Sequence, residues 1–205
     1  PNVCSYAGQP FLTGYEGGEP RELGVSLGDP TAGITAALAI NAALVARQRT
    51  GRGQYIDVSL WESTAATAVE GWMEFVMNGE DPPRRGNRDP HMAPHGVYRC
   101  SGEDNWVSIA CADDEEWKSL CQVLAPGLAA DQRFVSAAAR KRNESVLDEL
   151  INRITLELDR WDVTRKLQQV GVAAFPAMTA MDLAEDGHLD ARGFLTKLEH
   201  PEVGV

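Results

Sequence analysis

The chain has 205 residues, of which 43% are apolar and 24% are charged, an ordinary globular composition that excludes a disordered or collagen-like chain. Its formal net charge is −11 at pH 7, so its surface should repel the phosphates of nucleic acids and anionic lipids. We therefore expect neither a nucleic acid nor a membrane as a partner.

The first region in chain order, residues 1–24, is rich in Gly, Pro and Tyr and has little periodicity, which predicts a loop. A long helix should follow over residues 30–49. Asp29 fits the N-cap position, and Pro30 fits the first turn, where a missing N–H costs nothing. Gly51 should end the helix.

This helix is apolar on nearly every side, which indicates an interior position. Its longest apolar run, residues 32–46, is interrupted by Thr35 and Asn41. The run is shorter than the roughly 20 residues that a membrane span needs. We therefore predict a buried core helix here.

Apolar and polar residues alternate over residues 54–60, which predicts a short strand, and helical periodicity returns over 61–77. The segment 78–94 contains four prolines and should be a loop at a domain boundary. Two long helices and one strand cannot close a sheet. The first third therefore looks like half of a domain whose other half is missing.

The rest of the chain predicts an α+β arrangement with a short antiparallel sheet. Residues 96–100 and 106–112 should form a hairpin, and a strand over 172–178 contains Pro176, which favours a sheet edge. We also expect helices over 113–124, 137–158, 161–170 and 179–185, and a last strand over 194–198. Asp113 or Asp114 should cap the first of these helices, and the second should break near Asn143.

Cysteines and histidines show no metal-binding or disulfide spacing. The four cysteines Cys4, Cys100, Cys111 and Cys121 contain no CxxC pair, so we expect free thiols in a reducing, cytoplasmic compartment. The histidines His91, His95, His188 and His200 follow no HExxH-like pattern, and we predict no metal site.

The most basic cluster comprises Arg84, Arg85, Arg88 and Arg99. It could form a ligand site for an anion, but a solvated linker explains the same charges and is the favoured interpretation.

Several motifs occur together and in order. Gly28-Asp-Pro-Thr-Ala-Gly33 precedes the apolar helix, and Arg49-Thr-Gly-Arg-Gly-Gln54 follows it. The second half contains Pro94-His-Gly-Val-Tyr98, Gly102-Glu-Asp-Asn-Trp-Val-Ser-Ile109 and Ala191-Arg-Gly-Phe194. In these blocks the chain resembles the class III coenzyme A transferase family, which includes formyl-CoA transferase, carnitine CoA-transferase and alpha-methylacyl-CoA racemase.

The resemblance implies an α/β fold with a Rossmann-like large domain, a small α+β domain, and two interlocked ring-shaped subunits forming a homodimer. On this sequence it implies that residues 1–80 are part of the large CoA-binding domain, without its N-terminal half. Residues 81–95 would then be the linker and residues 96–205 the small domain.

The resemblance also places the family's catalytic aspartate on Asp29. That carboxylate would attack an acyl-CoA donor and then carry CoA as an aspartyl thioester, which a carboxylic acid acceptor opens. Coenzyme A thioester is the substrate in this scheme, and no tightly bound cofactor is expected. A helix N-terminus would keep the carboxylate ionised.

Local sequence alone favours a plain capping role for Asp29, and the resemblance favours catalysis. Gly28 and Gly33 would leave room for a bound CoA thioester. His95 could line the mouth of the same CoA site, although a plain loop role is favoured for it and for His91.

Two alternatives stay open. An acyl-CoA racemase of the same family would use an aspartate for proton transfer, and its histidine would lie upstream of Pro1. A truncated homologue could also serve as a non-catalytic assembly module. With the N-terminal half missing, we expect the isolated fragment to be inactive.

Overall fold

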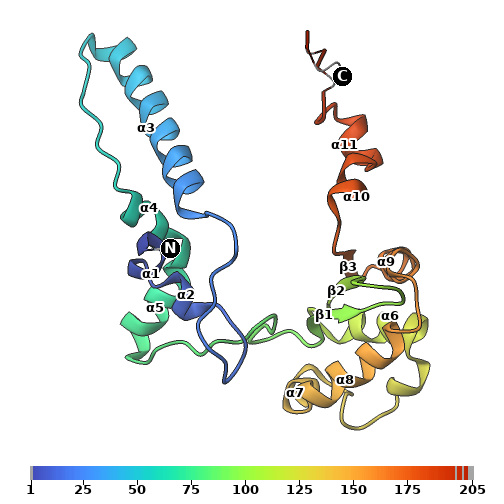
Figure 1. The fold of residues 1–205 in the computed structure, drawn as a ribbon. Coiled ribbons are helices and arrows are strands. Elements are labelled where there is room, and N and C mark those ends of the chain that lie inside the picture. Colours follow the sequence, from blue (N-terminus) through green and yellow to red (C-terminus); the bar gives the residue numbers. More distant parts are fainter. Residues whose placement is uncertain (1, 197, 200, 203–205) are drawn as a thin grey trace. The chain divides into compact units, whose positions relative to one another are not determined.

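The computed structural model describes residues 2–196, 198, 199, 201 and 202. The chain divides into two compact units, unit 1 with residues 1–87 and unit 2 with residues 88–205 (Figure 1). The division falls inside the 81–95 segment that the sequence indicates as a linker.

Unit 1 is helical throughout its regular structure. Its elements are α1 (Asn2–Tyr6), α2 (Gln9–Leu12), α3 (Gly28–Thr50), α4 (Leu60–Ala65), the 3-10 turn η1 (Ala66–Ala68) and α5 (Val69–Asn78). The prediction of a loop over 1–24 is wrong for α1 and α2. Gly8 joins these two helices at a φ of +79°, and Pro10 lies in the first turn of α2. The helical prediction over 61–77 is confirmed.

The long helix α3 forms as predicted, and Gly51 ends it with a φ of +71°. Its expected interior position is wrong for this chain, because Gly28 is its only buried residue among those described. Ile34 and Leu38 are 72% and 71% exposed. The other segments of unit 1 are too few to cover a 23-residue apolar helix.

By length and composition, α3 is also the one described helix that could cross a membrane, with a mean hydropathy of 1.3 in its best window and none of that window buried. A core helix of a soluble protein passes the same test. Asp29 lies at one end and three arginines follow near the other (Arg47, Arg49 and Arg52).

The strand predicted over residues 54–60 is absent from the structure. Residues 52–59 run as an irregular chain, and Leu60 already belongs to α4. Figure 1 shows this segment returning beside α3 toward α4. A strand requires a neighbour for its N–H and C=O groups, and among the described residues none pairs with this segment. The alternating pattern therefore has no sheet to join.

Unit 2 contains a three-stranded antiparallel sheet in the order β1-β2-β3, formed by β1 (His95–Arg99), β2 (Trp106–Ala110) and β3 (Ala173–Pro176). Val97 pairs with Ser108, and Ser108 with Phe175. The predicted hairpin and the predicted edge position of the Pro176 strand are both confirmed.

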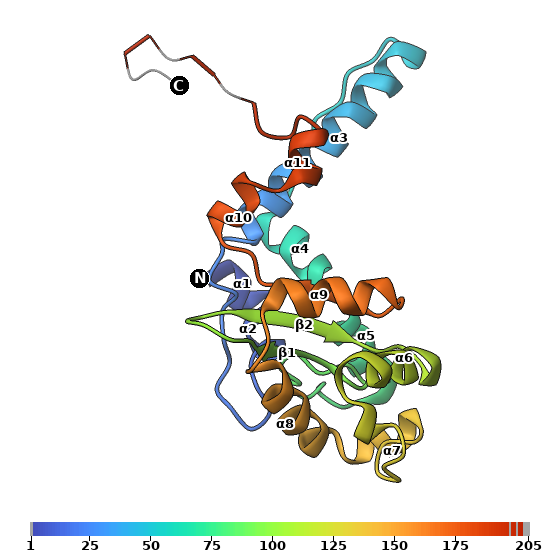
Figure 2. The same ribbon diagram turned by 90° about the vertical axis from the view of Figure 1, so that its right-hand side faces the viewer.

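Four longer helices accompany the sheet: α6 (Asp114–Leu124), α7 (Ala137–Arg142), α8 (Glu144–Thr155) and α9 (Arg160–Gln169). Helix α8 contacts β1, and α9 contacts β2 and β3. The 3-10 turn η2 (Pro126–Leu128) and the short helices α10 (Ala180–Ala184) and α11 (Gly187–Ala191) complete the unit. Figure 2 shows α9 beside β2. Asp113 caps α6 by accepting from the N–H groups of Glu115 and Glu116, as predicted.

The predicted break near Asn143 separates α7 from α8, and the helices predicted over 161–170 and 179–185 are confirmed as α9 and α10. The last strand predicted over 194–198 does not form at residues 194–196 and 198. Lys197 lies outside the described residues. Helix α11 was not anticipated.

The core of unit 2 is continuous and contains sixteen buried apolar residues from Ala93 to Ala174. Trp117 and Phe134 meet edge to face with ring centroids 6.1 Å apart. Arg140 is fully buried beside them. Its guanidinium donates to the carbonyl of Ala93 at 2.6 Å and to Asp114 Oδ1 at 2.9 Å. The buried guanidinium thus has hydrogen-bond partners, and it links α7 to the start of the hairpin and to α6.

Candidate active site

Asp29 lies on the first turn of α3 in unit 1 and is exposed. It is not the N-cap, contrary to the prediction. Leu27 is the cap, with helical backbone angles (φ −73°, ψ −35°) and no side-chain capping bond. The helix therefore begins earlier than the sequence indicates, and the Asp29 side chain is not committed to an amide of its own turn.

The Asp29 carboxylate has one described partner. The Ser26 hydroxyl donates to Asp29 Oδ2 at 2.5 Å, a length typical of a hydrogen bond to a charged acceptor. Among the described residues, no donor contacts Oδ1. One oxygen of the carboxylate is thus held and the other is open to a reactant.

Gly28 and Gly33 differ in their surroundings. A Cβ on Gly28 would lie 2.8 Å from Thr64 Oγ1 and 3.7 Å from Cys4 Sγ, whereas one on Gly33 would meet nothing within 4 Å. Gly28 therefore permits close packing of α3 on α4. Only Gly33 leaves open space on the surface of α3.

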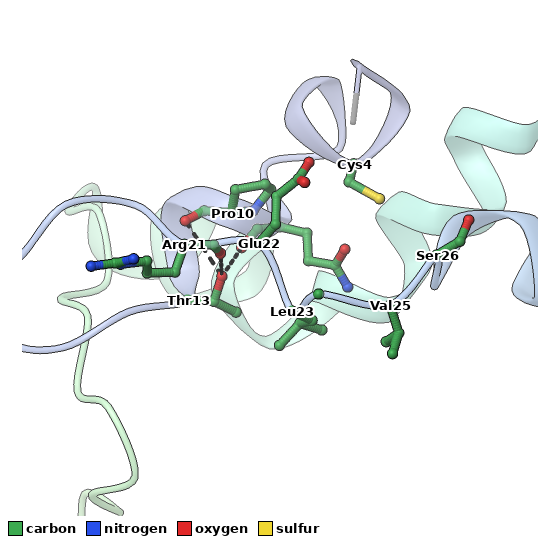
Figure 3. A pocket seen from close by; sticks show the side chains of 10 residues that line it. Cys4, Pro10, Thr13, Arg21, Glu22, Leu23, Val25 and Ser26 are labelled. Carbon is green, nitrogen blue, oxygen red and sulfur yellow. Dashed lines mark hydrogen bonds between the residues drawn. The ribbon is translucent and has the colours of Figure 1, made fainter.

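A cavity of about 220 Å³ lies next to this helix start (Figure 3). Its lining includes Ser26, Cys4 and Thr13. The loop on its wall is closed on itself, since Thr13 Oγ1 donates to the Arg21 carbonyl and the Arg21 amide donates to the Thr13 carbonyl at 3.0 Å. The structure thus brings a cavity, a hydroxyl and a carboxylate together within unit 1.

His95 lies in unit 2, where it is the first residue of β1. It is half-buried, and His91 is exposed in the preceding loop. Burial raises the pKa of the nearby Asp89 carboxyl, but hydrogen bonds from the His91 and Met92 amides and the charges of both histidines outweigh it, so that the pKa is lowered. The described contacts of this loop support a structural role.

The arginine cluster is also explained by contacts within each unit. In unit 1, Arg84 donates to the carbonyls of Phe11 and Gly18, and Arg85 lies 3.6 Å from Glu74. In unit 2, Arg88 pairs with Asp148 at 3.1 Å, and Arg99 stacks on Trp106. These contacts favour the linker interpretation over an anion site.

Two of the buried cysteines are unsuited to nucleophilic chemistry. Burial raises the pKa of Cys111 to about 12 and that of Cys121 to about 11, so both thiols stay protonated at neutral pH. Within the described part of the chain, no group of three His, Cys, Asp or Glu side chains could hold a metal ion.

Sequence analysis missed Ser26. The signal was present, because Ser26 stands three residues before an acidic residue at the start of an apolar run, which is the spacing of a capping box. That pattern indicates a contact between the two positions, although it does not say which atom donates.

Comparison with solved structures defines the fold class. A crystal structure of a CAIB/BAIF family protein from Brucella suis superimposes with a TM-score of 0.85 and 30% identity, covering 98% of this chain and 56% of that one. The mixed α/β arrangement with its small antiparallel sheet is therefore that of the CaiB/BaiF proteins.

Residues 1–205 match the family described as CoA-transferase family III, and the chain belongs to it. Relatives include succinyl-CoA–D-citramalate CoA-transferase of Chloroflexus aurantiacus, 31% identical over 194 residues, and acetyl-CoA:oxalate CoA-transferase of Acetobacter aceti, 34% identical over 200 residues. These matches cover 94% and 95% of this chain but 48% and 50% of the relatives. The chain spans about half the length of the curated relatives it matches.

Proposed function

We propose that Asp29 is the covalent nucleophile of an enzyme that transfers coenzyme A between carboxylic acids. The observation that carries the proposal is the Asp29 carboxylate itself, exposed at the start of α3 beside a cavity, with Oδ2 held by Ser26 and Oδ1 open. Membership of CoA-transferase family III supports it.

The proposed reaction begins when Asp29 Oδ1 attacks the acyl carbon of the donor thioester and displaces CoA as a thiolate. The thiolate then attacks Cγ of the mixed anhydride and expels the donor acid as a carboxylate, which takes Oδ1 with it. An aspartyl-CoA thioester remains on Asp29. Covalent catalysis of this kind divides one difficult exchange into easier steps.

The acceptor acid completes the cycle in the reverse order. Its carboxylate attacks Cγ of the thioester and displaces the CoA thiolate, which attacks the acceptor carbonyl and restores the Asp29 carboxylate. The names of two relatives pair an acyl-CoA with oxalate or mesaconate, and the name of a third pairs succinate with glutarate. These names support small carboxylic acids as the substrate class.

The intact enzyme is proposed to contain a complete Rossmann-like large domain, of which unit 1 is a part, and to act as an interlocked homodimer in the cytoplasm. The exposed apolar surface of α3 and the unpaired segment 52–59 support additional polypeptide around unit 1. In that arrangement α3 is a core helix and crosses no membrane.

Covalent trapping tests the proposal. Full-length enzyme carrying this sequence is incubated with acyl-CoA and then with hydroxylamine, and the peptide containing Asp29 is analysed by mass spectrometry. We expect a hydroxamate on Asp29 and no adduct in Asp29→Asn. The matched control Asp57→Asn, at an exposed carboxylate of unit 1, should react like wild type.

The same samples test the racemase alternative. Exchange of the substrate's α-hydrogen with solvent deuterium, without any adduct on Asp29, would contradict the transferase proposal and support proton transfer at the α carbon. Adduct formation without α-exchange would support transfer.

A further inference from the structure

The hydroxyl of Ser26 is the one described group that contacts the carboxylate of Asp29. Its Oγ donates to Oδ2 at 2.5 Å, and the same residue lines the adjoining cavity, where Figure 3 shows its side chain near the α3 end of the pocket. Ser26 thus both lines the cavity and contacts the carboxylate.

Helix capping does not explain this contact. At two other helix starts with the same three-residue spacing, the side chain acts as a cap: Ser59 Oγ accepts from the Glu62 amide, and Thr179 Oγ1 accepts from the Asp182 amide. Thr179 Oγ1 also donates to Asp182 Oδ2 at 2.7 Å, but it does so as part of a capping box. Among the described residues, Ser26 makes only the contact between hydroxyl and carboxylate, because the N-cap of α3 is Leu27 and α3 has no side-chain cap.

We propose that Ser26 is a positioning residue that fixes the nucleophile with Oδ1 toward the substrate and donates to Oδ2 when negative charge develops there. The inference rests on the proposed role of Asp29. Because Oδ1 forms the new bond to the acyl carbon, Oδ2 becomes the carbonyl oxygen of the aspartyl anhydride. It stays the carbonyl oxygen of the thioester that follows.

Two later steps place charge on this oxygen. Attack of the CoA thiolate on Cγ converts the Cγ–Oδ2 double bond to a single bond, and the electron pair moves to Oδ2. Collapse restores the double bond and expels the donor carboxylate. Attack of the acceptor carboxylate on the thioester repeats the cycle and expels the thiolate. A donor already aimed at Oδ2 stabilises both intermediates without reorganisation.

The packing behind the turn supports this function. Gly28 lies so close to Thr64 that a Cβ would clash with Thr64 Oγ1 at 2.8 Å, and Thr64 is itself held by its bond to the Leu60 carbonyl at 2.8 Å. The backbone between Ser26 and Asp29 therefore rests on α4, which keeps the two side chains in register.

The test compares Ser26→Ala and Ser26→Thr in the full-length enzyme. We expect Ser26→Ala to lower kcat about a hundredfold, as loss of one oxyanion donor does, with KM unchanged within about twofold. Ser26→Thr keeps a hydroxyl and should recover most of the rate. The matched control is Thr31→Val on the same turn, because Thr31 Oγ1 bonds only the Leu27 carbonyl among the described residues.

Two outcomes would overturn the inference. One is a Ser26→Ala enzyme with kcat within twofold of wild type, and the other is a Ser26→Thr enzyme no faster than Ser26→Ala. The wild-type adduct on Asp29 separates this failure from failure of the proposed function. If wild type forms the adduct but Ser26→Ala forms it equally fast, the role of Ser26 alone is wrong. If wild type forms none, the nucleophile assignment is wrong.

Discussion

Unit 2 buries a continuous core, whereas unit 1 leaves most of its apolar side chains in solvent. All sixteen residues of the buried apolar cluster belong to unit 2. In unit 1 the buried apolar side chains are Ala7 and Ala68 among the residues described. Large exposed patches of apolar surface mark interaction sites on soluble proteins, so unit 1 needs a covering that unit 2 does not.

The proposed chemistry lies in the uncovered unit. Asp29, Ser26 and the adjoining cavity all belong to unit 1. Under the proposal, this site should work only when further polypeptide covers the exposed apolar surface of unit 1, because catalysis requires a preorganised and water-excluding environment. The contrast can be tested by mutations in each unit.

The largest effect is expected at Arg140 in unit 2. Arg140→Ala removes a fully buried cation and leaves buried carbonyls of Ala93 and Phe134 without a donor. Breaking such a buried network costs about 3–5 kcal/mol. Urea denaturation should show this loss, and the exposed Arg165→Ala, which removes only a surface pair with Asp162, should cost less than about 1 kcal/mol. Equal losses would contradict the description of the core.

A second comparison uses two leucines. Leu147 is fully buried in unit 2, and Leu38 on α3 is 71% exposed. Leu147→Ala should lower the free energy of unfolding by about 2–5 kcal/mol. Leu38→Ala should change that of the 205-residue chain by less than about 0.5 kcal/mol. In the full-length enzyme Leu38→Ala should become costly, and an unchanged thermal midpoint there would argue against a core position for α3.

Alanine substitutions at two glycines of α3 should change the stability by smaller amounts, and the two changes should have opposite signs. Gly28→Ala should destabilise by about 1–3 kcal/mol because its methyl group would press on Thr64. Gly33→Ala meets open space and should stabilise the helix by up to about 1 kcal/mol. Circular dichroism of both variants during thermal unfolding measures the difference. Destabilisation by Gly33→Ala would show that its surroundings are not open.

The smallest effect concerns the attachment of α10 to unit 2. Hydrogen bonds from Thr179, and then from Arg160, lower the pKa of the Asp182 carboxyl. Since the folded pKa is depressed, the stabilisation is present above the ordinary value of 3.8 and is lost as pH falls through the folded pKa. Carboxyl NMR titration should place the Asp182 midpoint below 3.8. A midpoint at or above that value would mean that α10 is detached.

Sequence predicted unit 2 better than unit 1 for a physical reason. The hairpin, the cap of α6 by Asp113 and the break at Asn143 depend on signals within a few residues. The strand over 54–60 and the interior position of α3 depend on neighbouring polypeptide, which the described chain does not supply. Local periodicity predicted the helices over 30–49 and 61–77, but it cannot supply the neighbour that a strand over 54–60 would need.

The candidate site was predictable only in part. The resemblance to a family selected Asp29, since local sequence favoured a cap, and the structure places the cap at Leu27. Ser26 escaped notice because a serine three residues before an acid has the spacing of a capping box. The two roles differ in the structure because α3 has no side-chain capping bond, while the Ser26 hydroxyl donates to Asp29 Oδ2.

The most direct measurement is single-turnover reaction of acyl-CoA with the full-length enzyme and, separately, with the 205-residue chain, followed by mass spectrometry of both proteins. If Asp29 is the nucleophile and unit 1 works only with the rest of its domain, the full-length enzyme should carry one CoA adduct per subunit, on Asp29. The isolated chain should carry none. An adduct on any other residue, or rapid adduct formation by the isolated chain, would contradict this description.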